Sequence, residues 1–201
     1  MIKNVIFDIG FVLVDFNFDE FIQKKFDDKT CHEISKTMWG SRYWRELDMG
    51  IKPMEEVLEG FVQEVKGYEN QMREVIRDFG QCMSLRDFVI DWMKELKAKG
   101  IKIYFLSNWS EFLSNANPSV LDFMEYVDGG VFSCDVHMVK PNTEIYDYIC
   151  KKYSLNPEEC IFIDDLDANV EAACNYGIHG MVYEGFELSY KKMNDIIEEL
   201  S

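Results

Sequence analysis

The chain has 201 residues, enough for one large domain or for one domain with an insertion. Hydrophobic residues make up 47% of it, which can fill a sizeable core, and no internal repeat or low-complexity segment interrupts the pattern. The 37 acidic and 21 basic residues give a net charge of -16, which argues against binding nucleic acid or an anionic membrane, because phosphate groups would be repelled. An anionic substrate would need a local positive field that the site itself creates.

The ends and the cysteines predict a protein of a reducing compartment. The N-terminal segment "MIKNVIFD" is too short and too soon charged for a signal peptide, and no apolar run reaches membrane-spanning length. The six cysteines show neither a CxxC motif nor paired spacing, which predicts buried free thiols and argues against a zinc site. We therefore expect a cytoplasmic protein.

The first apolar run covers residues 5–7 and stops at a lone carboxylate, Asp8, with Gly10 two positions later. Four similar runs follow much further along the chain, at residues 101–106, 131–132, 161–163 and 181–183. None of the five alternates cleanly between apolar and polar residues. This predicts strands that are covered on both faces, as in a parallel sheet.

The segment after the first strand shows helical periodicity and no convincing strand. Its apolar residues form three stripes: Phe18, Phe21, Ile22 and Phe26; Met54, Val57, Leu58, Phe61 and Val65; and Met72, Val75, Ile76 and Phe79. Pro53 lies near the first turn of the second helix, a usual place for proline. We predict a small helical domain over residues 16–84, inserted into a core domain of residues 1–15 and 85–201. Residues 14–16 and 84–87 would be its hinges.

Helical patterns also separate the later strands. Their apolar stripes are Phe88, Val89, Trp92, Met93 and Leu96; Ile145, Tyr146, Ile149 and Cys150; Val170, Ala173 and Cys174; and Met193, Ile196, Ile197 and Leu200. Gly100 and Gly177 stand where helices should end, and Ser189 is expected to cap the last helix. The alternation predicts an α/β protein with a doubly wound, parallel, five-stranded, Rossmann-like sheet. The helical insertion would lie over the crevice at the carboxyl ends of the strands.

Polar residues stand at the carboxyl ends of four predicted strands. They are Asp8; Ser107 and Asn108 in "FLSNWS"; Lys140 in "HMVKPNTEIY"; and Asp164 and Asp165 in "FIDDLDANV". Each has an ordinary explanation on its own, as a turn residue, a helix cap or a surface lysine. A parallel sheet would bring all of them to one edge, and this coincidence predicts an active site.

The four motifs carry a resemblance to a known family. In chain order, "FDIGFV", "LSN", "VKP" and "IDDLDANV" resemble the haloacid dehalogenase-like (HAD) hydrolase superfamily, in the subfamily with a helical cap after the first strand. The likeness covers nearly the full length. Within the superfamily the chain is most similar to bacterial sugar-phosphate phosphatases of the α-D-glucose-1-phosphate phosphatase type. In their "FDLGNV" start, glycine also replaces the second aspartate.

The resemblance implies a Mg²⁺-dependent phosphatase of a small phosphomonoester, expected to be a sugar phosphate such as an anomeric hexose phosphate. Asp8 would be the nucleophile and would form an aspartyl-phosphate. Asp8, Asp165 and the Gly10 carbonyl would hold the Mg²⁺, with Asp164 as a direct ligand or just behind one.

Basic and amide side chains would complete the site. Lys140 would bind phosphoryl oxygens and hold Asp8 ionised beside its acidic neighbours. Ser107 and Asn108 would orient the same oxygens. Asn169 would form a hydrogen bond near the acidic loop. The expected partner is a small phosphorylated metabolite, and the chain would be a monomer or a homodimer.

Gly10 leaves open how the leaving group is protonated. Most phosphatases of this superfamily have a second aspartate at that position, and a positioned acid or base contributes about 10²–10⁴-fold. Another group or water could supply the proton, or the leaving group could need little help, as the acidic hydroxyl of an anomeric sugar phosphate would. The chain could instead be a metal-free 2-haloacid dehalogenase, although that reaction has no use for the adjacent Asp164 and Asp165. It could also be an inactive module that binds a phosphorylated ligand, although such a module would not need Asp8.

The insertion contains an aromatic segment, "MWGSRYWRELDMG". Trp39, Tyr43 and Trp44 could stack on a sugar ring, with Arg42 or Arg45 offering charge, or they could form the core of the small domain itself. The end of the segment, "LDMG", resembles the acidic-x-Gly turn that capped relatives carry between cap helices.

Overall fold

The computed structural model describes residues 1–200. Its central sheet has five parallel strands in the order β5-β4-β1-β6-β7. Their bounds are β1 Asn4–Phe7, β4 Lys102–Ser107, β5 Gly129–Phe132, β6 Cys160–Asp164 and β7 His179–Val182. All five strands expected from the sequence are confirmed, each end falling within two residues of its predicted position.

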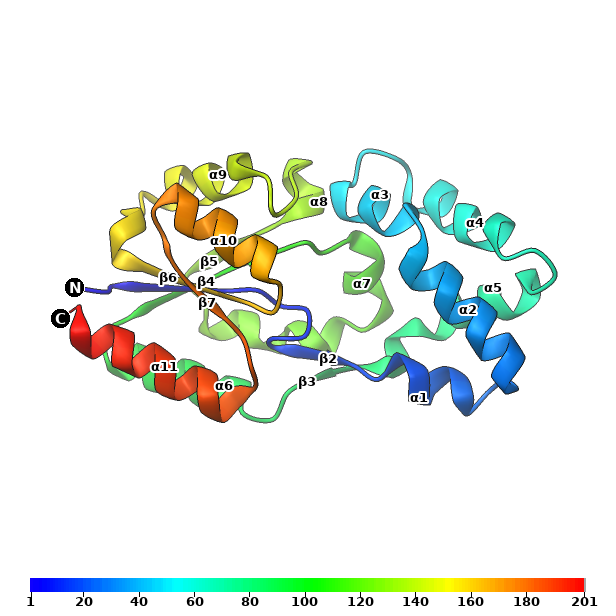
Figure 1. Ribbon diagram of the computed structural model, residues 1–201, viewed down its shortest axis with the longest axis horizontal. Coiled ribbons are helices and arrows are strands. Elements are labelled where there is room, and N and C mark those ends of the chain that lie inside the picture. Colours follow the sequence, from blue (N-terminus) through cyan, green and yellow to red (C-terminus); the bar gives the residue numbers. More distant parts are fainter. Residues whose placement is uncertain (201) are drawn as a thin grey trace.

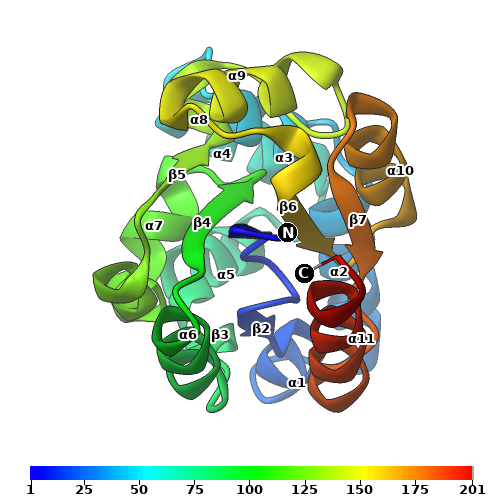
Figure 2. The same ribbon diagram turned by 90° about the vertical axis from the view of Figure 1, so that its left-hand side faces the viewer.

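Helices cover both faces of this sheet (Figures 1 and 2). Val5 and Phe7 of β1 belong to a core cluster that also holds apolar residues of α6 (Val89–Ala98) and α11 (Phe186–Glu199). Ile6 belongs to the opposite cluster, with residues of α9 (Thr143–Tyr153) and α10 (Asp167–Tyr176). Successive side chains of a strand point to opposite faces, and both faces here are apolar and buried. The predicted doubly wound α/β architecture is therefore confirmed.

The insertion after β1 is helical and lies at the end of the molecule opposite the two termini (Figure 1). It consists of α1 (Phe18–Gln23), α2 (Asp28–Gly40), α3 (Tyr43–Met49), α4 (Met54–Glu64) and α5 (Glu69–Asp78). All residues of the three predicted stripes are buried in the large core cluster or packed against it. The small domain thus shares a continuous apolar core with the face of the sheet below it.

Two short strands join the core to this cap, and the sequence pattern did not predict them. β2 (Val14–Phe16) pairs antiparallel with β3 (Met83–Leu85), in the register Val14↔Leu85 and Phe16↔Met83. Strands of three residues are too short to show a periodicity, so their pairing is decided by tertiary structure. The pair lies where the hinges were expected. The division into a core of residues 1–15 and 85–201 and a cap of residues 16–84 remains an interpretation, with boundaries inside this pair.

Two local expectations were wrong. Helix α11 begins at Phe186, so Ser189 lies inside the helix and not at its N-cap; its hydroxyl accepts the Glu184 N–H at 3.1 Å. All six cysteines are free, but Cys174 is exposed and Cys134 is half-buried, so not every thiol lies in the core.

The remaining elements are short: η1 Phe79–Cys82, α7 Glu111–Ala116, η2 Pro118–Tyr126, α8 Ser133–Val136 and η3 Pro157–Glu159. Within residues 1–200, no helix combines the length and the apolar character needed to span a bilayer.

Candidate active site

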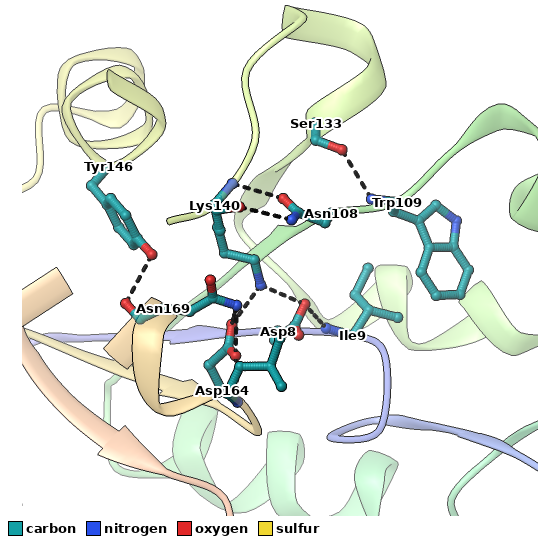
Figure 3. A network of polar contacts seen from close by, with 10 residues as sticks. Asp8, Ile9, Asn108, Trp109, Ser133, Lys140, Tyr146, Asp164 and Asn169 are labelled. Carbon is teal, nitrogen blue, oxygen red and sulfur yellow. Dashed lines mark hydrogen bonds and ion pairs between the residues drawn. The ribbon is translucent and has the colours of Figure 1, made fainter. Parts of the chain in front are cut away.

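The structure brings predicted site residues together at one edge of the sheet, and Figure 3 shows Asp8, Asn108, Lys140 and Asp164 among them. There they border a cavity of about 270 Å³. The cavity lining includes six of the predicted residues: Asp8, Gly10, Ser107, Asn108, Lys140 and Asp165. Asn169, from the first turns of α10, lines it as well. Asp164 is fully buried just behind the lining.

Lys140 bridges two carboxylates at the centre of the site. Its Nζ lies 2.8 Å from Asp8 Oδ1 and 2.5 Å from Asp164 Oδ2. All three side chains are buried, with Lys140 only 4% exposed. Burial by itself would lower the pKa of the Lys140 ammonium, but the negative charges of Asp8 and Asp164 outweigh it, so the pKa is raised. Lys140 is therefore a fixed positive charge inside an acidic protein, the local field that the net charge of the chain made necessary.

Asp8 is held in one orientation. Besides the ion pair with Lys140, its Oδ1 accepts the Ile9 backbone N–H at 2.7 Å. Burial raises the pKa of Asp8 to about 7; Lys140 lowers this pKa and Asp164 raises it further. Lys140 thus acts in the direction expected from the sequence, but burial is the larger influence on Asp8.

Asp164 has no free oxygen. Its Oδ1 accepts hydrogen bonds from Leu166 N at 2.9 Å and Asn169 Nδ2 at 2.9 Å. Its Oδ2 accepts from Lys140 and from Asn169 Nδ2, the latter at 3.1 Å. The backbone of Asn169 is held in turn, because the Tyr146 hydroxyl donates to the Asn169 backbone carbonyl at 2.8 Å. These contacts make Asp164 and Asn169 the support that positions Lys140 (Figure 3).

Asp165, the neighbour of Asp164, is the open carboxylate. It lines the cavity, and within the described chain its side chain makes no hydrogen bond or ion pair with another residue's side chain. Burial and the charge of Asp164 raise its pKa to about 6, while Lys140 lowers it. Carboxylate oxygens of Asp8, Asp164 and Asp165 lie within 4.8 Å of one another. An all-oxygen donor set of this size fits a hard divalent cation, Mg²⁺ in particular.

The two polar residues after β4 differ in their surroundings. The Asn108 side chain is engaged: its Oδ1 accepts Lys140 N at 2.8 Å, and its Nδ2 donates to the Lys140 carbonyl at 3.0 Å. The Ser107 hydroxyl is buried and close enough to Asp8 to lower its pKa, but it has no hydrogen-bond partner of good geometry in the described chain. A buried hydroxyl without a partner is costly, and an oxygen-rich ligand in the cavity would satisfy it.

The cap supplies a mostly aromatic wall. Trp39 and Trp44 both line the cavity, and their rings stack at 5.5 Å with an interplanar angle of 9°. Trp44 also packs against Phe61 and Phe79, so it belongs to the cap core as well. Tyr43, Arg42 and Arg45 do not line the cavity. The core explanation therefore holds for Trp44, and stacking of Trp39 and Trp44 on a sugar stays a prediction.

Among the polar residues of the lining, Asp48 was not predicted from the sequence. Asp48, near the end of α3, is the acidic residue that the cap contributes to the cavity. The "LDMG" turn was the signal that could have identified it, because it placed a carboxylate beside a glycine turn between cap helices.

Comparison with known proteins settles the family. The family model described as haloacid dehalogenase-like hydrolase matches residues 2–177. The chain belongs to the haloacid dehalogenase-like hydrolases. The resemblance proposed from the four motifs is thus confirmed at the level of the superfamily.

Among curated proteins, this HAD-like hydrolase is similar to enzymes of varied substrates. It is 30% identical to acyl-CoA dehydrogenase family member 10 of Mus musculus over 105 residues, 52% of this chain and 10% of that protein. It is 25% identical to flavin mononucleotide hydrolase 1 of Arabidopsis thaliana over 157 residues, 76% of this chain and 61% of that protein. It is 27% identical to D-ribitol-5-phosphate phosphatase of Bacteroides thetaiotaomicron over 192 residues, 88% of this chain and 89% of that protein. The chain thus spans less than two thirds of the length of the first two of these relatives.

Solved structures of HAD proteins share the fold. A HAD-like family hydrolase from Porphyromonas gingivalis superposes with a TM-score of 0.78 at 24% identity, over 98% of both chains. A HAD family enzyme from Bacteroides thetaiotaomicron, in complex with magnesium and inorganic phosphate, superposes with a TM-score of 0.72 at 20% identity, over 95% of this chain and 99% of that one.

Proposed function

We propose that this HAD-like hydrolase is a Mg²⁺-dependent phosphatase that cleaves a small phosphomonoester through an aspartyl-phosphate on Asp8. The observation that carries the proposal is the setting of Asp8: a buried carboxylate at a strand end, lining a cavity, with the Lys140 ammonium at 2.8 Å. Because Lys140 and the Ile9 N–H hold its Oδ1, the carboxylate is oriented in advance for attack on phosphorus. A carboxylate nucleophile forms an acyl-phosphate, which water then hydrolyses.

The other polar groups at the sheet edge suit the same reaction. Lys140 would pair with phosphoryl oxygens as well as with Asp8 and so reduce the repulsion between carboxylate and phosphate. Ser107, whose buried hydroxyl lacks a partner of good geometry, would donate to a phosphoryl oxygen. Asn108 would contribute chiefly by fixing the Lys140 backbone, because both ends of its amide are engaged there.

The donor set fits Mg²⁺. Asp8, Asp165 and the carbonyl of Gly10 would hold the ion, and Asp164 would stay outside the direct ligands because both of its oxygens already accept hydrogen bonds. When bound, the ion supplies positive charge that offsets the charge of the phosphate group. The likeness in fold to an enzyme that binds magnesium and inorganic phosphate supports this assignment.

A phosphatase explains the site better than the two alternatives. A metal-free 2-haloacid dehalogenase would have no use for the open carboxylate of Asp165. An inactive binding module would have no use for the fixed nucleophile at Asp8. Two relatives, D-ribitol-5-phosphate phosphatase and flavin mononucleotide hydrolase 1, carry names of phosphomonoester chemistry.

The cavity favours a substrate with one phosphate and an uncharged remainder. Lys140 is the cationic side chain of its lining within the described chain, so a second phosphate would find no partner. The stacked Trp39 and Trp44 offer a flat apolar face of the kind that packs on sugar rings. We therefore keep a sugar phosphate, such as an anomeric hexose phosphate, as the proposed substrate class, and the cytoplasm with its small phosphorylated metabolites as the proposed location.

The test is phosphate release from a panel of sugar phosphates, alditol phosphates and flavin mononucleotide, each with Mg²⁺ and with chelator. Asp8→Asn is the inactive control, and Asp91→Asn, at an exposed site on α6, is the matched control for the same substitution. We expect release that requires Mg²⁺, is lost in Asp8→Asn and persists in Asp91→Asn. Release that is independent of both Mg²⁺ and Asp8 would contradict the proposal, as would halide release from chloroacetate in the presence of chelator.

A further inference from the structure

The proposed reaction needs a proton donor that the core does not provide. When Asp8 attacks phosphorus, the ester oxygen leaves on the opposite side of the phosphorus atom. An alkoxide leaving group needs a proton, and the water that later cleaves the aspartyl-phosphate must lose one from the same side. Gly10 has no side chain to do either. The missing group must therefore lie on the side of the cavity that faces away from Asp8.

Three titratable acids line the cavity in the described chain: Asp8, Asp165 and Asp48. Asp8 and Asp165 stand at the carboxyl ends of β1 and β6 in the core. Asp48 comes from the cap, near the end of α3, and it shares the cap side of the lining with Trp39 and Trp44. Its carboxylate makes no hydrogen bond or ion pair with another side chain in the part of the chain that the structure describes. Asp48 is thus the acid that the cap brings to the cavity, and it is not engaged elsewhere.

The core holds the turn that carries Asp48. The Ser133 hydroxyl donates to the Asp48 carbonyl at 2.6 Å and accepts the Trp109 N–H at 3.0 Å, which links the cap turn to the end of β4. The next carbonyl, of Met49, lies 2.8 Å from His137 Nδ1. Gly50 then takes a φ of 60°, and a Cβ there would lie 2.6 Å from the Cys134 carbonyl oxygen. Three successive residues of the cap are therefore seated on α8 and the residue after it, which fixes Asp48 relative to the sheet edge.

The surroundings of Asp48 keep its proton available near neutral pH. Burial raises its pKa to about 7; Lys140 lowers this pKa and Asp8 raises it. Helix α3 packs on α4 and α8, whose charged residues are Glu55, Glu56, Glu59, Glu64 and Asp135, with His137 just after α8. None of those six lines the cavity. The charged groups that share the cavity with Asp48 are Asp8, Asp165 and Lys140.

We propose that Asp48 takes the place of the second aspartate that Gly10 lacks and serves as general acid and then general base. The inference rests on the proposed phosphatase function. An Asp8 oxygen forms a bond to phosphorus as the bond from phosphorus to the ester oxygen breaks, and the protonated Asp48 carboxyl gives its proton to that oxygen, which leaves as an alcohol. A water oxygen then bonds to phosphorus while Asp48 takes one of its protons. The bond from phosphorus to Asp8 breaks, which releases hydrogen phosphate and restores both aspartates.

A leaving-group comparison separates this role from simple substrate binding. Asp48→Asn is compared with wild type and with Glu46→Gln, a neighbour on α3 that pairs with Lys52 and does not line the cavity. For an alkyl phosphate from the active panel we expect kcat to fall by about 10²-fold or more in Asp48→Asn. With 4-nitrophenyl phosphate, whose leaving group needs no proton, we expect a burst of one nitrophenol per enzyme followed by slow turnover. If Asp48→Asn loses kcat/KM equally on both substrates, through a higher KM and without a burst, the proposal is overturned.

Placing an aspartate at position 10 gives a second, independent test of the role of Asp48. A Cβ at Gly10 would meet only Phe16 Cε2 at 3.7 Å, an ordinary contact, and so the position has room for a side chain. We expect Gly10→Asp to recover alkyl phosphate turnover in the Asp48→Asn background. A double variant that folds like wild type and is still as slow on the alkyl phosphate as Asp48→Asn would count against the proposal. If wild type shows no phosphate release that depends on Asp8, the proposed phosphatase function is overturned. If wild type is active and Asp48→Asn has the same kcat, only the role of Asp48 is overturned.

Discussion

The side-chain amide of Asn108 makes two hydrogen bonds with the backbone of Lys140: its Oδ1 accepts the N–H at 2.8 Å, and its Nδ2 donates to the carbonyl at 3.0 Å. The end of β4 is thereby tied to the loop before α9 at the residue whose ammonium reaches Asp8. The backbone of Lys140 is held by Asn108, and its ammonium is held by Asp8 and Asp164. The surroundings of Asp8 therefore include a side chain, Asn108, that acts on it only through Lys140.

Replacing Asn108 tests this dependence. We expect Asn108→Ala to lower kcat by about 10–100-fold, because misplacement of an orienting group by a small distance is costly in catalysis. Steady-state kinetics on the best substrate of the panel measure the effect. Asn142→Ala is the matched control, since Asn142 is exposed at the start of α9 and its side chain makes no capping hydrogen bond. Equal kcat values for the two variants would show that the hydrogen bonds from Asn108 to the Lys140 backbone do not affect catalysis.

Removing the charge of Lys140 should affect stability as well as activity. Lys140→Met leaves Asp8 and Asp164 buried without their cation, a change that typically costs about 3–5 kcal/mol. Urea unfolding at neutral pH measures the loss. Lys151→Met is the control, because its pair with Asp147 is exposed and should contribute at most about 0.5 kcal/mol. Similar midpoints for wild type and Lys140→Met would contradict the view that the buried charges are mutually compensated.

Replacing Asp165 tests whether its carboxylate binds the metal. Asp165 is open to the cavity, so Asp165→Asn should raise the Mg²⁺ concentration needed for half-maximal activity by more than about tenfold. Isothermal titration with Mg²⁺ measures the same affinity without turnover. Asp167→Asn, at an exposed position in the first turn of α10, should leave it unchanged. If Asp167→Asn weakens Mg²⁺ binding as much as Asp165→Asn does, the cation is held by the general negative charge of this loop.

Asp48 should make the stability of the protein depend on pH. Its pKa is raised from 3.8 to about 7 by burial, so as pH rises from 4 to 7 the unfolded chain loses this proton before the folded one does. The folded state therefore becomes less stable over that range relative to a variant that cannot ionise. We expect Asp48→Asn to gain about 2–3 kcal/mol on wild type between pH 5 and pH 8, at about 1.36 kcal/mol for each unit between pH 5 and the folded pKa of about 7. Thermal unfolding in chelator at both pH values measures this gain, and a difference between the proteins that does not grow with pH would refute it.

The sequence by itself determined the sheet and the identity of most residues at its edge. Strands buried on both faces appear as apolar runs whatever surrounds them, and helices between them carry their own periodicity. Once the sheet is known to be parallel, residues at the carboxyl ends of strands must meet. Asp8, Ser107 and Asp165 could therefore be predicted to share a site from their positions alone, whereas Lys140 lies beyond α8 in the loop before α9.

Tertiary structure alone decided which partner each of these residues contacts. The strands β2 and β3 exist only because two distant segments pair, and neither segment is long enough to show a pattern. The engagement of Asn108 with Lys140, and of both Asp164 oxygens with their neighbours, depends on distances between chain segments that no local pattern encodes. Asp48 enters the cavity because α3 of the cap docks on α8 of the core, and that contact is decided by packing between two domains.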